Sequence, residues 1–470
     1  MSAPSNTRLK SDVIGLLGAA TLGLVFMSPA MTLYGLFGPI FLAAGKLAPM
    51  AFVLALVATL PTAFSYAVLS RDHPSAGSTA DWASQATGPK IGAWAGWLVF
   101  LYYLTNFIIQ VVAVGLFFNE LLIGLKVVLP SGAGFTAGVL LGCAWPAWMV
   151  YRGLSMSAKG ALVFLLIEIA TVAALCVTVV WLAPSRGTPV SFDGFSPTAA
   201  LQNTSGMFAA LVFAMLGFTG FDVVSTLAEE TRTARKLIPR ATIIAVLLYA
   251  VLIIAGMWAL TLGGDAAHLK SIAESGRMPI NDVAEKVWGR GSILVTVTAL
   301  TATLALIIAT SVGASRILFA KGRRLAAPAV FAKLHPQHQV PWPALNLIFA
   351  AGIIGTFVVF GFIGAYNAYV WWATTSTFFA MITFLFGNLA CIILNRHRLG
   401  SPSGLLLYGL IPSVGIVADI YILVQSFFIE LWAQPWATGK SVVVFDVACA
   451  VLAMGVVVLR KGPQSHQQNA

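Results

Sequence analysis

Charged residues are scarce in this chain. Only 9% of its 470 residues are Asp, Glu, Lys or Arg, whereas 59% are hydrophobic. Soluble domains carry about 25% charged residues, so this composition excludes an ordinary soluble domain. Long uncharged runs repeat along the whole chain, as they do in proteins that cross a membrane several times. The composition therefore predicts an all-α polytopic membrane protein.

Cysteine and histidine, which often bind metals or take part in catalysis, are also few. The chain has four cysteines and six histidines. The cysteines fall inside apolar segments with no pair at the spacing of a metal or redox site, and the histidines fall in predicted loops or tails. No pairing of a nucleophile with a base stands out either. The sequence thus predicts no metal site and no cofactor, and it argues against an enzyme.

The positive charge of the chain follows its predicted loops. The net charge is +11, but the basic residues lie in short loops between apolar segments, as topology signals do. This pattern argues against a nucleic-acid partner and predicts a multi-pass protein of the cell (cytoplasmic) membrane, with both termini in the cytoplasm. The apolar run that follows residues 1–12 is too long for a cleaved signal peptide.

Twelve apolar segments cover almost the whole sequence. We expect cytoplasmic tails at 1–12 and 461–470 and a single transporter domain at 13–460 between them. The predicted segments are 13–43, 46–70, 93–125, 133–151, 158–183, 203–228, 239–263, 292–318, 343–363, 366–394, 405–428 and 441–460.

Two of these segments are interrupted near their middle. The first contains "MSPAM" at 27–31, and the sixth contains "GFTGF" at 217–221, about 190 residues later. The spacing divides the chain into a first repeat at 13–183, a second at 203–394 and two extra helices at 405–460. Because each repeat has five segments, the second enters the membrane upside down. Paired interruptions in inverted repeats indicate a secondary transporter with its site at the interruptions.

The first interruption has the residue types that start a helix. Ser28 is a good N-cap and Pro29 is favoured at the first helical position. The amides of the new half-helix would face the middle of the membrane and favour an electron-rich group. The alternative is a proline kink that neighbouring groups satisfy. The predicted substrate-binding residues here are Ser28, Pro29, Ala30, Met31 and Thr32.

The second interruption combines glycine with an acid. Gly217 and Gly220 permit unwinding at low steric cost, and together with Thr219 they are predicted substrate-binding residues. Thr219 and Asp222 have the spacing of a capping box, in which the threonine caps the inner half-helix. This capping role is one interpretation of Asp222, and a role in proton or cation coupling is the other.

A second acid lies deep in the fifth segment. Glu168 is a candidate proton carrier or a counter-ion for an amine, or else a neutral acid bonded to a neighbouring helix. Asn106 in the third segment could line the path of a solute. Asp419 and Asp446 fall outside the repeats and are interpreted as structural. The charged loop after the sixth segment, including Glu229, is either a solvated loop or an intracellular gate.

Three stretches resemble one transporter superfamily. "GFTGFDVVSTLAEETRTARKLIPRA", "SRILFAKGRRLAAPAVFAKLHPQHQVPWPALN" and "SRDHPSAGSTADWA" resemble motifs of the amino acid–polyamine–organocation transporters. Within this superfamily, the bacterial putrescine importers have the interruptions that are most similar to "MSPAM" and "GFTGF". The resemblance implies a leucine-transporter-type fold of 5+5 inverted repeats with broken helices 1 and 6, and substrate between the breaks.

The resemblance also implies particular roles. Asn106 matches a substrate-facing position of helix 3, and Glu168 matches a helix 5 position where some members place a lysine. The aromatic gate of helix 6 corresponds to Leu216, with Phe218 close by and Phe213 as a second candidate. Putrescine importers carry an acid near the start of helix 3, where this chain has Tyr102, which weakens a diamine interpretation.

We therefore predict a permease that moves an amino acid or a related amine by alternating access. A proton is the expected coupling ion, carried by Glu168 or Asp222. One alternative is an importer specific for putrescine or polyamines. An alternative of another class is a membrane nutrient sensor on the same fold that transports nothing. The oligomeric state stays open.

Overall fold

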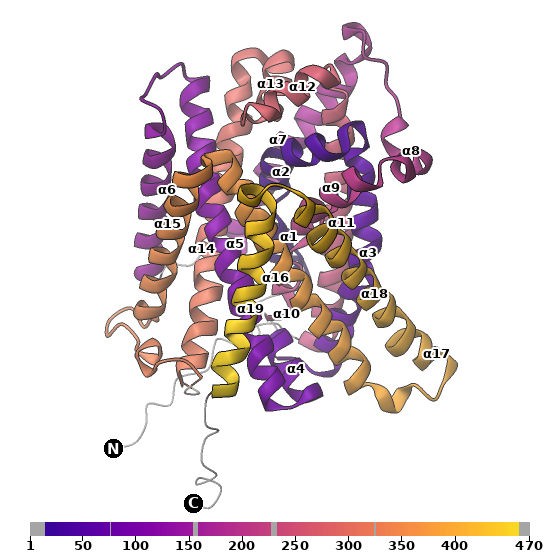
Figure 1. Ribbon diagram of the computed structural model, residues 1–470, viewed down its shortest axis with the longest axis vertical. Coiled ribbons are helices and arrows are strands. Elements are labelled where there is room, and N and C mark those ends of the chain that lie inside the picture. Colours follow the sequence, from indigo (N-terminus) through magenta and orange to yellow (C-terminus); the bar gives the residue numbers. More distant parts are fainter. Residues whose placement is uncertain (1–14, 76, 154–157, 227–232, 324–325, 460–470) are drawn as a thin grey trace, which may run out of the picture.

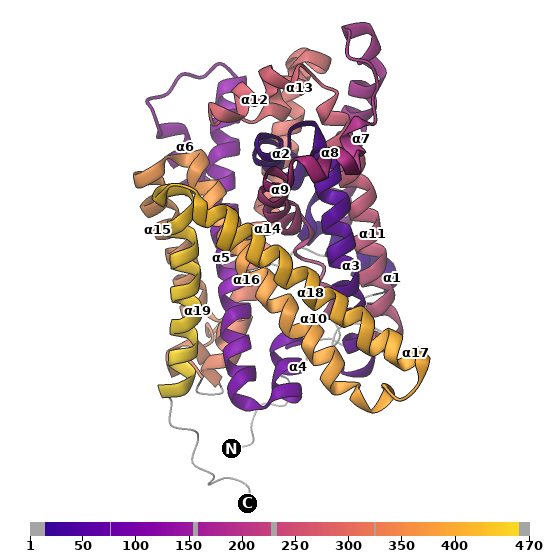
Figure 2. The same cartoon turned by 45° about the vertical axis from the view of Figure 1, so that its right-hand side comes forward.

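The computed structural model describes residues 15–75, 77–153, 158–226, 233–323 and 326–459. Along these residues every regular element is helical, which confirms the predicted all-α polytopic fold (Figures 1 and 2). Both predicted tails, and the part of the charged loop that includes Glu229, lie outside the described residues. The structure therefore leaves the proposed gate in that loop untested.

Eleven helical runs in the described residues are long and apolar enough to cross a membrane. The first, Leu16–Asp72, has 57 residues and contains the first two predicted segments, so each of the twelve predicted segments has its helix. The long helices are α1 (Leu16–Met27), α2 (Pro29–Ala44), α3 (Ala48–Asp72), α5 (Pro89–Gly124), α6 (Ala133–Tyr151), α7 (Ala158–Leu182), α9 (Thr204–Phe218), α11 (Ala234–Thr261), α14 (Ile293–Arg323), α15 (Trp342–Ile363), α16 (Ala365–Leu394), α18 (Ile411–Leu423) and α19 (Ser441–Leu459).

Six short helices connect or cap the long ones. They are α4 (Ser78–Thr87), α8 (Pro197–Gln202), α10 (Val223–Thr226), α12 (Ala266–Glu274), α13 (Pro279–Trp288) and α17 (Pro402–Gly404). The polar stretch after the seventh segment forms α12 and α13, and Asp265 caps α12 by accepting hydrogen bonds from the amides of Ala267 and His268. Figures 1 and 2 place α12 and α13 at one end of the bundle and α4 at the other.

The first predicted interruption is confirmed. Helix α1 ends at Met27 and α2 begins at Pro29, with Ser28 between them at φ 37°. The Ser28 amide donates to the Leu24 carbonyl at 2.9 Å, which closes α1. The Ser28 hydroxyl accepts from the Met31 amide at 3.4 Å, which starts α2. One residue thus ends one half-helix and caps the next.

The second interruption is also present, but its capping differs from the prediction. Thr219 ends α9, because its hydroxyl donates to the Leu216 carbonyl at 2.7 Å. The capping acceptor is Asp222, which receives the Gly220 amide at 3.1 Å. Gly220 has φ 110°, a conformation that essentially only glycine adopts. The turn therefore depends on glycine and aspartate rather than on a threonine cap.

The two interrupted helices lie against a scaffold of continuous ones. Helix α3 packs on α11, α1 packs on α11, and α2 packs on α9. Helix α5 lies between α14 and α16. Helix α1 also packs on α10, so contacts of α1 with α10 and of α2 with α9 hold the two interruptions together.

A polar cluster closes the end of the bundle where α12 and α13 lie. Arg277 donates to both carboxylate oxygens of Glu120, at 2.8 and 3.2 Å. Asn281 donates to Glu120 at 2.9 Å and to the Tyr34 hydroxyl at 2.7 Å, and Thr296 donates to the Asn281 side-chain oxygen at 3.0 Å. The hydrogen bonds with Glu120 raise the pKa of Arg277 above its usual value. This cluster, which we call the polar latch, joins α2, α5, α13 and α14.

We expect Arg277→Ala to lower the apparent Tm of the purified protein. The Glu120 side chain is only 4% exposed, so loss of its partner leaves a buried charge that costs about 1–3 kcal/mol. Adding Glu120→Gln should restore part of the loss, because the unpaired charge disappears.

The matched control is Lys270→Ala, which breaks the Lys270–Glu274 ion pair. Both of those side chains are 59% exposed, and such pairs contribute little. An Arg277→Ala protein as stable as Lys270→Ala would contradict the structural role of the polar latch.

Candidate functional site

A cavity lies between the two interruptions. It is narrow in this conformation, with a cavity volume of about 20 Å³. The lining residues come from five helices that the fold brings together, α1, α2, α5, α9 and α14, and from the turn after α9. They are Phe26, Met27, Met31, Thr32, Leu36, Asn106, Ile109, Gln110, Leu216, Gly217, Thr219 and Leu306.

The structure brings half of the predicted substrate-binding residues into this lining. They are Met31, Thr32, Asn106, Leu216, Gly217 and Thr219. The others lie behind it and take part in the breaks or in the core. Those residues are Ser28, Pro29, Ala30, Phe213, Phe218 and Gly220.

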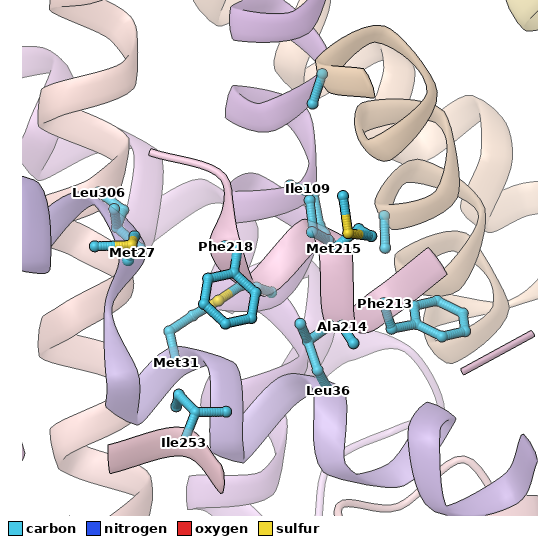
Figure 3. Packing of buried hydrophobic residues seen from close by; sticks show 14 of the residues in the cluster. Met27, Met31, Leu36, Ile109, Phe213, Ala214, Met215, Phe218, Ile253 and Leu306 are labelled. Atoms are coloured by element: carbon cyan, nitrogen blue, oxygen red, sulfur yellow. The ribbon is translucent and has the colours of Figure 1, made fainter. Parts of the chain in front are cut away.

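Neither predicted aromatic gate residue of α9 lines the cavity. Phe218 is fully buried and packs edge-on against Tyr249, with ring centroids 5.2 Å apart. In Figure 3, Phe213 lies on the opposite side of the labelled cluster from the lining residue Met27. The aromatic residue in the lining is Phe26 from the other broken helix, and α9 contributes Leu216. An aromatic side chain therefore does border the cavity, from α1 rather than from α9.

Several lining residues were missed by the sequence prediction. Ile109 and Gln110 follow Asn106 by three and four residues, so they share its helix face. That periodicity could have identified them once Asn106 was chosen. Leu306 and Leu36 are ordinary apolar helix residues, and nothing in the sequence separates them from core leucines. In Figure 3, Leu306 lies near Met27 on one side of Met31, and Leu36 lies on the other side.

Glu168 from α7 holds the first break together. Its carboxylate accepts a hydrogen bond from the Ser28 hydroxyl at 3.1 Å, and the Ala30 backbone amide faces it. The residue is only 3% exposed. The carboxylate thus lies at the N-terminus of α2, where the helix dipole favours a negative charge.

Asp222 has the same kind of position at the second break. Besides the Gly220 amide, it accepts a hydrogen bond from the Tyr102 hydroxyl at 3.3 Å, and it is buried. Tyr102 is the residue found where the resemblance expects an acid. An acid is therefore present next to Tyr102, but it is Asp222, which directly precedes α10, rather than a residue of α5.

Thr32 links three of the helices around the cavity. Its hydroxyl donates to the Met27 carbonyl at 3.1 Å and accepts from the Tyr249 hydroxyl at 3.0 Å. A Cβ on Gly217 would lie 2.6 Å from that same tyrosine oxygen. The glycine therefore leaves room for the Tyr249 hydroxyl against α9.

The other buried acids lie elsewhere. Asp419 accepts hydrogen bonds from Thr62 at 3.3 Å and from Asn388 at 3.2 Å, which joins α18 to α3 and α16. Asp446 is buried on α19. Within the described ranges, no group of three or more His, Cys, Asp or Glu side chains could hold a metal ion.

Two broken helices around a cavity, in a bundle of apolar helices, are typical of membrane transporters. The chain belongs to the amino acid permease family, whose model matches residues 16–462. This assignment agrees with the superfamily resemblance of the sequence motifs.

The relatives of the chain are transporters. It is 28% identical over 396 residues to the low-affinity putrescine importer PlaP of Escherichia coli strain K12, which covers 83% of this chain and 82% of that protein. It is 25% identical to the branched-chain amino acid permease BcaP of Lactococcus lactis, over 81% of this chain and 82% of that one. It is also 25% identical to the L-methionine/branched-chain amino acid exporter YjeH of Escherichia coli strain K12, over 86% of this chain and 90% of that protein.

Gly220→Ala should damage the second break. The new Cβ would lie 3.0 Å from the backbone carbon of Phe26, and φ 110° disfavours any side chain, at a cost of about 1–3 kcal/mol. We expect a lower apparent Tm and a strong loss of substrate binding, measured on purified protein.

Gly361→Ala on α15 is the matched control, because a Cβ there meets nothing within 4 Å. We expect this variant to keep the apparent Tm and the substrate affinity of the unmodified protein. Normal binding by Gly220→Ala would mean that the turn is not needed for the site.

Proposed function

We propose that the chain is a proton-coupled permease of the cytoplasmic membrane that moves an amino acid or a related amine by alternating access. The observation that carries the proposal is the cavity bordered by both helix breaks. A break in each repeat places unwound backbone at the same depth, which is how secondary transporters of this type bind solutes. The printed activities of the relatives support the same solute class.

The lining suits a small solute with a polar end and an apolar body. Thr32, Asn106, Gln110 and Thr219 offer polar groups. Most of the remaining lining is hydrocarbon and thioether, which accommodates an aliphatic side chain at favourable hydrophobic free energy. In this proposal a single twelve-helix domain at 13–460 carries the whole activity, with both termini in the cytoplasm.

The two buried carboxylates are the proposed coupling groups. Each lies at one break, Glu168 with Ser28 and Asp222 with Gly220. An acid deep in a membrane bundle is costly unless it is neutralised or fully hydrogen-bonded. A proton on Glu168 removes the negative charge from the start of α2 and weakens its hold on Ser28 and Ala30. Proton binding would then loosen the break and favour movement of the half-helix.

Opening must alternate between the two ends of the bundle. At one end the polar latch joins α2 and α5 to α13, and at the other the Ser78 and Ser225 hydroxyls are 2.6 Å apart and join α4 to α10. Each of these contacts involves one half of a broken helix. Movement of α2 in one step and α10 in the other would open each end in turn.

The test is uptake by purified protein in liposomes. We expect labelled amine or amino acid to accumulate when the lumen is alkaline, and a protonophore to abolish the accumulation. Glu168→Gln should lose accumulation but keep exchange of labelled for unlabelled solute, because a neutral side chain keeps the break hydrogen-bonded without carrying a proton.

Asp446→Asn is the control, since it neutralises another buried acid on α19, away from both breaks. We expect it to accumulate solute like the unmodified protein. Accumulation that survives the protonophore would contradict proton coupling. Binding without any flux would favour the sensor alternative.

A further inference from the structure

The amides at the start of α2 are already occupied from within the chain. The first four amides of a helix lack helical partners, and here they belong to Ser28, Pro29, Ala30 and Met31. The Ser28 amide bonds to Leu24, and proline has no N–H. The Ala30 amide faces the Glu168 carboxylate, and the Met31 amide bonds to the Ser28 hydroxyl. Each N–H of this first turn is therefore already directed at an acceptor of the chain.

In its ionised form, Glu168 also repels a second anion from this position. Its carboxylate already takes the place that the helix dipole offers to a negative group. A substrate carboxylate brought to the same helix end would face a like charge in a buried, weakly screened environment. Among the described residues that line the cavity, none is Lys, Arg or His, so the lining offers no cation to compensate.

The cavity instead offers acceptors for a cation. The side-chain Oε1 of Gln110 is buried and has no hydrogen-bond partner, and Gln110 borders the cavity. The C-terminal turns of α1 and α9 contribute Met27 and Leu216 to the lining. The carbonyl ends of these two helices carry the negative pole of the dipole, which favours an ammonium group.

We propose that Glu168 is a built-in occupant of the anion position, so that the cavity selects an aliphatic amine that carries no carboxylate. The ammonium group binds near Gln110 and the ends of α1 and α9, and the hydrocarbon part lies against Met31, Leu36 and Leu306. This inference rests on the proposed function, because it takes the cavity to be the substrate site. It makes Glu168 a specificity-determining residue that acts without touching the substrate.

Pairs of compounds that differ only in a carboxylate test the inference on the purified full-length protein. Suitable pairs are isopentylamine with leucine, 3-(methylthio)propylamine with methionine, and putrescine with ornithine. Affinities come from ligand-dependent shifts in apparent Tm, since a ligand that binds only the folded state stabilises it. We expect the amine of at least one pair to bind at least tenfold more tightly than its amino acid, and no pair to show the reverse order.

Glu168→Gln should reduce this preference at least tenfold, chiefly by tighter binding of the amino acids. Asp419→Asn is the control, because it neutralises a buried acid that α18 holds against Thr62 and Asn388, and its preference should be unchanged. The comparison in the unmodified protein decides the matter even if Glu168→Gln fails to fold.

The outcomes separate the inference from the proposed function. Amino acids that bind as tightly as their amines, or a preference that Glu168→Gln leaves intact, would overturn the inference alone. Amine binding without any uptake in liposomes would overturn the transport proposal and leave the inference standing. Binding of none of the six compounds would overturn the inference, because it requires at least one of the three amines to bind.

Discussion

The structure depends on the hydrogen bonds that satisfy unwound backbone inside a membrane bundle. Lipid offers no partner to a free amide or carbonyl, so an interrupted helix is stable only where protein groups replace the missing bonds. Ser28 does this for both half-helices of the first break, and Glu168 completes the arrangement from α7. Without these contacts the break would be an energetic defect, and the cavity beside it would not persist.

At the second break, different residues form the hydrogen bonds that the interrupted backbone needs. Asp222 accepts hydrogen bonds from the Gly220 amide and the Tyr102 hydroxyl, while Thr219 ends α9. Each break therefore has its own buried carboxylate. Charge, backbone geometry and cavity are coupled at both points, so a change in the protonation of either acid acts on a half-helix directly. This coupling links the local hydrogen bonds to the proposed transport cycle.

Much of the fold could be predicted from the sequence, because apolar segments and helix-starting residues are local signals. Ser28 followed by Pro29 identified the first break to the residue. The capping of the second break could not be predicted in the same way, since Thr219 and Asp222 fit a capping box but Gly220 at positive φ redirects the chain.

The sequence near each residue does not indicate which side chain of another helix it will contact. Tertiary packing decides that Phe218 faces Tyr249 while Leu216 faces the cavity, although both residues lie in one turn of α9. The partnership of Glu168 with Ser28 joins residues 140 positions apart, which no spacing rule reveals. The sequence could place both residues at depth, but only the fold shows that one of them occupies the helix end offered by the other.

The central claim is that the substrate lies between the two breaks. The most direct measurement is an experimental structure of the protein with its tightest-binding amine or amino acid. The account predicts density for the ligand beside Asn106 and Gln110, in contact with the last turns of α1 and α9. Density for the ligand outside this cavity, for example against α18 or α19 with the cavity unchanged, would contradict the account.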